Sequence, residues 1–133
     1  MADTPKTKKQ KTKNTAANKT SGFDTAKELC ELLKEHNGGD VTLIDLRNIP
    51  MWTDFFIIVT VTSSTHLGGL ERRIKEKVKE KNLGLLRSHK KSAKDDDWQF
   101  CDLGDIVIHL MSEKSRAFYD LERLWTDGVI TKF

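Results

Sequence analysis

The amino-acid sequence predicts one α+β domain in which helices pack on a mixed β-sheet. Two observations support this prediction. After an N-terminal segment that lacks large apolar side chains, the patterns run in the order helix, two strands, helix, strands, helix. The remaining residues, 23–133, are enough to build one hydrophobic core but too few for two domains.

The N-terminal segment, residues 1–22, is expected to be disordered. It contains six Lys and one Asp, and it has no Leu, Ile, Val, Phe, Trp or Tyr. Such a segment cannot bury enough apolar surface to offset its loss of conformational entropy. It also lacks the apolar stretch of a secretory signal and the arginines typical of an organellar transit peptide, so we expect a cytoplasmic location.

The domain is expected to begin with a helix capped by Asp24 and ended by Gly38-Gly39. Its buried positions should be Ala26, Leu29, Cys30 and Leu33. Residues Val41–Leu46 then form a first strand. Residues Phe55–Thr62 form a long central strand, because its first half is apolar on both faces.

A second helix should follow a cap at Ser63 or Ser64. Its apolar residues recur at helical spacing, at Leu67, Leu70, Ile74 and Val78. Glu71 and Lys75 lie four residues apart on the solvent side and should form an ion pair. A short strand is predicted at Leu83–Ser88, followed by a charged loop over His89–Asp97.

Two strands, a tight turn and a helix then follow with almost no spacer. Trp98 and Phe100 place apolar side chains on one face of the first strand, and Ile106–Met111 is apolar on both faces, as in a central strand. Gly104 can supply the positive φ of the turn between them. Ser112 should cap a final helix with an apolar stripe. The stripe consists of Phe118, Leu121 and Trp125, widened by Ala117 and Leu124.

Charge is unevenly distributed. Residues 23–133 hold 17 Lys and Arg against 19 Asp and Glu, whereas residues 95–125 hold eight acids against three bases. The body therefore lacks the overall basic character of an RNA-binding domain. An acidic region that also contains two of the three tryptophans and the only tyrosine favours a basic protein as partner.

Several reactive residue types have a structural interpretation. His109 is flanked by apolar residues, which is typical of a hydrogen-bonded core histidine, and the other three histidines are scattered. Cys30 and Cys101 are expected to be small buried residues rather than ligands or a disulfide. No zinc spacing, P-loop or dinucleotide fingerprint is present, so neither a metal nor a cofactor is expected.

Several separated motifs resemble the ribosomal silencing factor family, also called RsfS or Iojap. The C-terminal motif consists of Trp98, Asp102, Gly104, Asp105, Ile106, Val107 and His109, then Glu113, Arg116, Tyr119, Leu121, Glu122, Leu124 and Trp125. Upstream, the segments Asp45–Arg47, Thr53–Ile58 and Ser64–Leu67 also resemble the family. The resemblance extends in order from about Phe23 to Trp125.

The resemblance implies a fold similar to the nucleotidyltransferase core and a non-enzymatic translation repressor. Such a protein would bind the large-subunit ribosomal protein of the L-fourteen family and block joining with the small subunit by steric exclusion. Trp98, Leu103 and Tyr119 would then make apolar contacts with the partner. Asp102, Asp105 and Glu122 would pair with its basic side chains, although the two aspartates could equally stabilise their own turn.

Two alternative functions, and the oligomeric state of the free protein, stay open at this point. A relic nucleotidyltransferase is disfavoured, because the turn at residues 62–69 lacks the Gly-Ser pair and no strand carries two acids one residue apart. An RNA-binding module could use the Lys-rich tail and the second helix, and the same tail could contact ribosomal RNA. An exposed aromatic patch would also allow the free protein to form a homodimer.

Overall fold

The computed structural model describes residues 22–84, 87–90 and 97–133. The predicted disordered tail lies outside these ranges except for its last residue, so its disorder stays a prediction. Six strands form one mixed sheet in the order β3-β4-β5-β2-β1-β6. The strands are β1 (Gly39–Asp45), β2 (Phe55–Val61), β3 (Arg87–Lys90), β4 (Trp98–Asp102), β5 (Ile106–Ser112) and β6 (Val129–Lys132).

The sheet is mixed because its two central strands are parallel. β2 and β5 pair in parallel, from Phe55 opposite Ile106 to Val61 opposite Ser112. Every other neighbouring pair is antiparallel. Both central strands are buried on both faces, as their continuous apolar sequences predict. The predicted α+β architecture is therefore confirmed.

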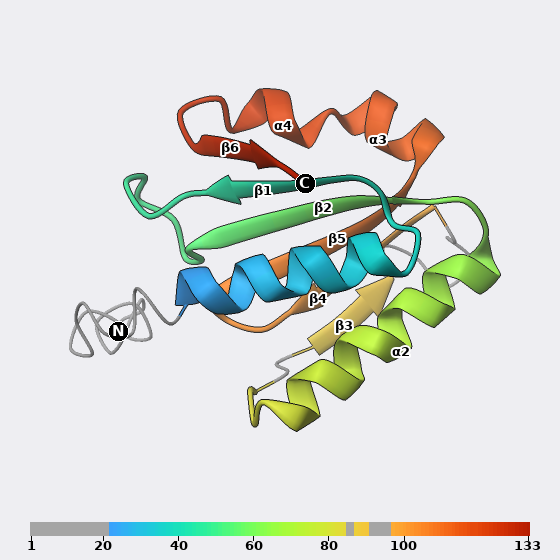
Figure 1. Cartoon of the computed structure of the whole chain (residues 1–133). Helices are drawn as coiled ribbons and strands as arrows, with labels where there is room; N and C mark the ends of the chain where they lie inside the picture. Colours follow the sequence, from blue (N-terminus) through green and yellow to red (C-terminus); the bar gives the residue numbers. More distant parts are fainter. Residues whose placement is uncertain (1–21, 85–86, 91–96) are drawn as a thin grey trace.

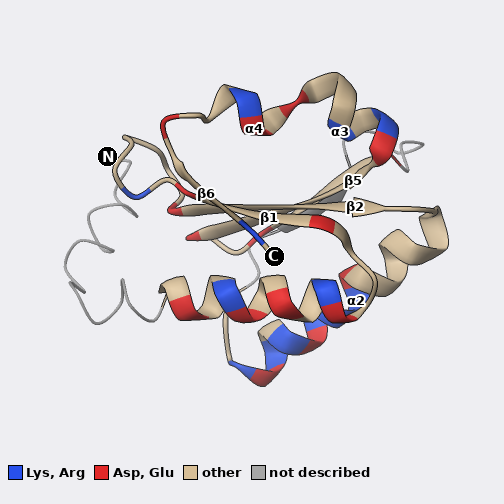
Figure 2. Cartoon of the chain, turned by 45° about the horizontal axis from the view of Figure 1, so that its top comes forward, with Lys and Arg blue, Asp and Glu red and all other residues tan. Residues whose placement is uncertain are grey.

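Helices cover the two faces of the sheet unequally. The first helix, residues 22–35, and α2 (Ser64–Glu80) lie on one face, and the short helices α3 (Glu113–Tyr119) and α4 (Leu121–Leu124) lie on the other (Figure 1). In the turned view the sheet forms a middle layer between them (Figure 2). Charged residues gather on the first helix and α2, whereas the central strands carry almost none (Figure 2).

The larger core lies under the two long helices. It joins the predicted buried residues of the first helix and of α2 to alternate residues of the central strands, such as Ile57 and Ile108. Both cysteines are buried in this core as thiols and are not joined in a disulfide. Burial raises the pKa of the Cys30 thiol to about 12, so this thiol stays protonated and behaves as a small apolar group.

Both long helices end in the same way, with an asparagine in the left-handed region. Asn37 has φ 70° and Asn82 has φ 58°. In each case the next residue donates its backbone N–H back into the last turn, Gly38 to Leu33 O at 2.7 Å and Leu83 to Val78 O at 2.8 Å. A Cβ on Gly38 would lie 2.6 Å from Val59 Cγ2, so the turn after the first helix requires glycine there.

Several local predictions are confirmed. Ser63 caps α2 by accepting a hydrogen bond from the His66 N–H at 3.0 Å. Gly104 turns the chain between β4 and β5 with φ 92°. Ser112 caps α3 through a 3.1 Å bond from the Ser115 N–H.

Other local predictions are wrong. The first helix already includes residue 22, so Asp24 lies within its first turn and does not cap it. The third strand was predicted at Leu83–Ser88, but Leu83 is not in a strand and β3 is Arg87–Lys90, while residues 85–86 lie outside the described residues. His89 and Lys90 are therefore paired residues and not loop. The rest of the predicted loop, residues 91–96, lies outside the described residues.

The predicted final helix is interrupted at Asp120. This residue takes a left-handed conformation, φ 46° and ψ 57°, which ends α3 and starts α4 in a new direction. The predicted apolar stripe therefore does not stay on one face: Phe118 is 79% exposed and Leu124 is 66% exposed. Ala117 is exposed as well, whereas Leu121 is buried and Trp125 is half-buried.

The sequence patterns also missed β6. This edge strand pairs antiparallel with β1, with Val129 opposite Asp45 and Lys132 opposite Thr42. All four of its residues are exposed. A strand without a buried face has no alternation of apolar and polar residues to reveal it.

Candidate functional site

A groove lined by aromatic side chains opens on the sheet face that α3 and α4 cover. α3 packs against β5 and β2, and the groove lies beside it, over β4, β5 and the start of β2. The groove has a volume of about 400 Å³. We call it the aromatic groove; its lining residues are Trp52, Phe56, Trp98, Phe100, Asp102, Val107 and His109.

Strand pairing brings these side chains together. Phe56 lies opposite Val107 in the parallel pair, and Phe100 lies opposite His109 in the antiparallel pair. Because alternate residues of a strand share a face, Trp98 and Phe100 point to the same side as Val107 and His109. Trp52 reaches the groove from the loop before β2 and is 57% exposed.

His109 is a buried polar residue among the side chains that line the groove. It is buried, 8% exposed, and its Nδ1 accepts a 3.1 Å hydrogen bond from Trp98 Nε1. The ring of Phe56 meets the imidazole edge to face at 4.8 Å. Burial lowers the pKa of His109 to about 4, so the ring is neutral at physiological pH. The interpretation of His109 as a hydrogen-bonded core histidine is confirmed.

The aromatic surface continues from the groove onto α3. Tyr119 packs against Trp98 with the ring centroids 4.6 Å apart. Phe118 then meets Tyr119 edge to face at 4.9 Å and projects into solvent. A large exposed aromatic side chain beside a groove of aromatic rings is a feature of protein-binding surfaces.

A buried arginine holds α3 and α4 on the sheet. Arg116 is 8% exposed, and its guanidinium donates to Thr60 Oγ1 at 2.9 Å and to Thr42 Oγ1 at 2.8 Å. It also forms a 2.7 Å ion pair with Glu122 of α4. Lys132 of β6 lies 3.8 Å from the same carboxylate. This network links both helices to β1, β2 and β6.

A second family motif has a structural role. Arg47 makes two hydrogen bonds to the Asp45 carboxylate, at 2.9 and 2.7 Å. Its guanidinium lies 5.0 Å from the centre of the Phe55 ring. The arginine thus stabilises the end of β1 against the start of β2.

The six predicted site residues separate into two groups. Trp98 and Asp102 line the aromatic groove, and Tyr119 packs directly on Trp98. These three form one continuous surface. The other three, Leu103, Asp105 and Glu122, do not line the groove.

Leu103, Asp105 and Glu122 each make contacts within the chain. Leu103 packs against the larger core on the opposite sheet face. The Asp105 carbonyl accepts the N–H groups of Asp54 and Phe55, each at 3.0 Å. Glu122 is paired with Arg116. Asp102 has both roles: it lines the groove, and its Oδ1 accepts a hydrogen bond from the Gly104 N–H of its own turn at 2.9 Å.

Four aromatic members of this surface were not predicted as site residues: Trp52, Phe56, Phe100 and Phe118. Phe118 was expected in the core, and Phe56 and Phe100 were assigned only to strands. A tryptophan in a segment between two strands, such as Trp52, is itself a signal of surface recognition. Phe56 could be placed beside Val107 only once the parallel pairing of β2 with β5 was known.

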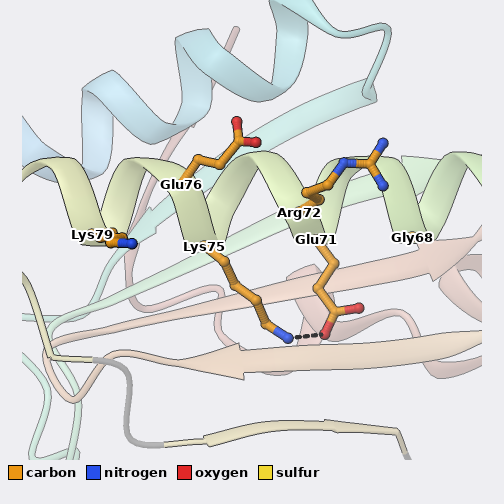
Figure 3. Close-up of a pocket in the computed structure, with 6 residues that line it drawn as sticks. All are labelled: Gly68, Glu71, Arg72, Lys75, Glu76 and Lys79. Carbon is orange, nitrogen blue, oxygen red and sulfur yellow. Dashed lines mark ion pairs between the residues drawn. The ribbon is translucent and has the colours of Figure 1, made fainter.

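A second, shallower groove of about 370 Å³ runs along the outer side of α2. Its lining residues are Gly68, Glu71, Arg72, Lys75, Glu76 and Lys79 (Figure 3). Glu71 and Lys75 form the predicted ion pair at 3.2 Å. Two further ion pairs along the helix, Arg73–Glu76 and Lys77–Glu80, offset most of its positive charge.

Within residues 22–84, 87–90 and 97–133, no three His, Cys, Asp or Glu side chains are grouped so that they could hold a metal ion. None of the helices in the same ranges combines the length and the apolar character needed to span a bilayer.

The sequence is similar to a known protein family and to several of its members. The family model described as ribosomal silencing factor during starvation matches residues 15–132. A ribosomal silencing factor RsfS of Treponema pallidum is 33% identical over 112 residues, which cover 84% of this chain and 99% of that protein. A mouse protein named mitochondrial assembly of ribosomal large subunit protein 1 is 35% identical over 99 residues, but the match spans only 43% of its length.

The fold is also found among solved structures. A crystal structure of a protein from Chromobacterium violaceum matches with a TM-score of 0.66 and 26% identity. The match covers 76% of this chain and 86% of that one. A second crystal structure, from Bacillus halodurans, matches with a TM-score of 0.62 and 25% identity.

Proposed function

Because this chain belongs to the ribosomal silencing factor family, we propose that it represses translation by binding the large ribosomal subunit and blocking its joining with the small subunit. The proposed partner is the large-subunit protein of the L-fourteen family, and the proposed location is the cytoplasm. The mechanism needs affinity, shape and bulk, and it requires no catalytic step.

The aromatic groove and its extension onto α3 support this proposal most strongly. Exposed aromatic side chains next to a groove provide the buried anchors of a protein interface. Trp98, Tyr119 and Phe118 would make these apolar contacts. Asp102 adds a carboxylate that can pair with a Lys or Arg of a basic ribosomal protein.

The other three predicted residues would contribute around this surface. Asp105 and Leu103 belong to the turn that follows Asp102, where they would contact the partner or fix the turn. Glu122 would act through Arg116, by holding α3 and α4 in place beside the groove. The Lys-rich tail, residues 1–22, would add a salt-sensitive contact with ribosomal RNA.

Co-sedimentation of the full chain with purified large subunits tests the proposal. We expect Trp98→Ala and Tyr119→Ala to abolish co-sedimentation while circular dichroism stays that of a folded domain. Lys79→Ala, on the outer side of α2, is the matched surface control and should bind like the unaltered chain. Normal binding by both folded aromatic variants would refute the assignment of the aromatic groove.

A subunit-joining assay tests the consequence of binding. Addition of the chain to separated subunits should reduce the fraction that forms whole ribosomes, and Trp98→Ala should restore it. If the chain binds large subunits but leaves joining unchanged, steric exclusion is the wrong mechanism even though the binding surface is right.

A further inference from the structure

The two ring nitrogens of His109 have different surroundings. Nδ1 accepts the hydrogen bond from Trp98 Nε1 at 3.1 Å. Nε2 is buried and has no hydrogen-bond partner among the residues that the structure describes. The residue as a whole is more than nine-tenths buried, and it lines the aromatic groove.

The bond from Trp98 fixes where the proton of His109 lies. An indole N–H can only donate, so Nδ1 must present its lone pair. The buried ring is neutral and carries one proton, which therefore lies on Nε2. Nε2–H is thus a buried donor without an acceptor, an arrangement that is unfavourable in the free protein and rare in native structures.

The other walls of the groove do not supply a conventional acceptor for this donor. The rings of Phe56, Trp98 and Phe100 surround the imidazole, with centroids 4.8, 5.9 and 6.2 Å from it. Their π faces attract an N–H only weakly. Nε2 is itself enclosed in the free protein, so an occupant that brings an oxygen acceptor can satisfy Nε2–H only by displacing a side chain that lines the groove.

Asp102 restricts the charge of that occupant. Its side chain lines the same groove and is 8% exposed. An occupant with a carboxylate would be repelled by Asp102, whereas a neutral carbonyl would not. The surrounding aromatic rings favour an apolar side chain next to that carbonyl.

We propose that the aromatic groove takes a peptide segment of the partner protein in which an apolar side chain lies beside a neutral carbonyl, and that His109 Nε2–H donates a hydrogen bond to this carbonyl. The proposal rests on the function proposed above and specifies its recognition chemistry. His109 is then a specificity-determining residue, and the hydrogen bond from Trp98 sets the tautomer that makes it a donor.

The test removes the His109 donor in a background where Trp98 no longer needs His109 as an acceptor. Trp98→Phe keeps an aromatic ring and deletes the indole N–H. In this background, His109→Phe should weaken co-sedimentation of the full chain with purified large subunits by about tenfold. The same change should raise the melting temperature of the free chain by roughly 3 °C, because it removes an unpaired buried donor.

Weaker binding together with a higher melting temperature would show that His109 acts in recognition and not in stabilising the fold. If His109→Phe lowers both binding and melting temperature, or leaves binding unchanged, the proposal is overturned. The proposed function still stands in that case if Trp98→Ala abolishes binding. If Trp98→Ala binds normally, both proposals fail together.

A measurement on the unaltered chain provides an independent check that does not depend on variants. Long-range proton–nitrogen correlation of the ¹⁵N-labelled chain at neutral pH should show His109 with its proton on Nε2. A proton on Nδ1 would contradict the proposal, because Nε2 would then be an acceptor.

Discussion

The two faces of the sheet differ in how completely helices cover them. Two long helices cover one face, and the larger core lies beneath them. The short helices α3 and α4 cover only part of the other face, and they leave the aromatic groove open. We therefore expect the first face mainly to supply stability, and we propose that the second face combines packing with recognition.

The largest expected change in stability tests the sheet face that the two long helices cover. Ile108→Ala should lower the free energy of unfolding by about 4 kcal/mol, because it removes a fully buried side chain from the larger core. Urea denaturation measures this loss. Val129→Ala, at a 60% exposed position, is the control and should change stability by less than about 0.5 kcal/mol. An equal loss of stability in Ile108→Ala and Val129→Ala would contradict the assignment of stability to the larger core.

The pH dependence of stability tests His109, the buried histidine that lines the aromatic groove. His109 has a pKa of about 4 in the folded chain and an ordinary value near 6.5 when unfolded. Between these values the unfolded chain binds a proton that the folded chain does not, so stability falls as pH decreases from about 6.5 to about 4. The loss should reach roughly 3 kcal/mol. His109→Phe should flatten this part of the curve; an unchanged slope would assign the loss to other groups.

The attachment of α3 and α4 should have a smaller effect on stability than the core. Arg116→Ala should cost about 2 kcal/mol, because it removes the ion pair with Glu122 and the hydrogen bonds to two threonine hydroxyls. Arg123→Ala, an exposed arginine of α4, should cost almost nothing. Hydrogen exchange should show faster opening of residues 113–124 in Arg116→Ala only. Uniformly faster exchange across the sheet would mean that the network supports the whole domain.

The smallest effect on stability should come from the exposed aromatic extension. Phe118→Ala should change the free energy of unfolding by less than about 0.5 kcal/mol, because the side chain is 79% exposed. The same variant should bind large subunits at least several-fold more weakly. Leu124→Ala, 66% exposed on α4, is the matched control for binding. A stability loss at Phe118 similar to that at Ile108 would show that this part of the open face is core.

Most of the fold could be predicted because its elements have buried faces. The apolar spacing of Leu67, Leu70, Ile74 and Val78 placed α2, and the uninterrupted apolar runs placed both central strands. β6 could not be found in this way, because its pairing with β1 depends on backbone hydrogen bonds and not on side-chain burial.

The break at Asp120 explains the main error in the predicted site. A helix drawn continuously through this residue places Phe118 on the same face as Leu121. A single left-handed residue turns the chain and leaves Phe118 in solvent. Trp98, Asp102 and Tyr119 were predicted correctly to share a surface, because strand alternation and a short helix fix them locally.

The parallel pairing of β2 with β5 has a consequence for synthesis of the chain. The partner of Phe55 is Ile106, so about fifty residues must be made after β2 before its second neighbour exists. Until then one long edge of β2 has unpaired backbone groups, and such edges invite association between chains. Fragments that stop before β5 should therefore aggregate, and a nascent chain should reach its native sheet only when its translation is nearly complete.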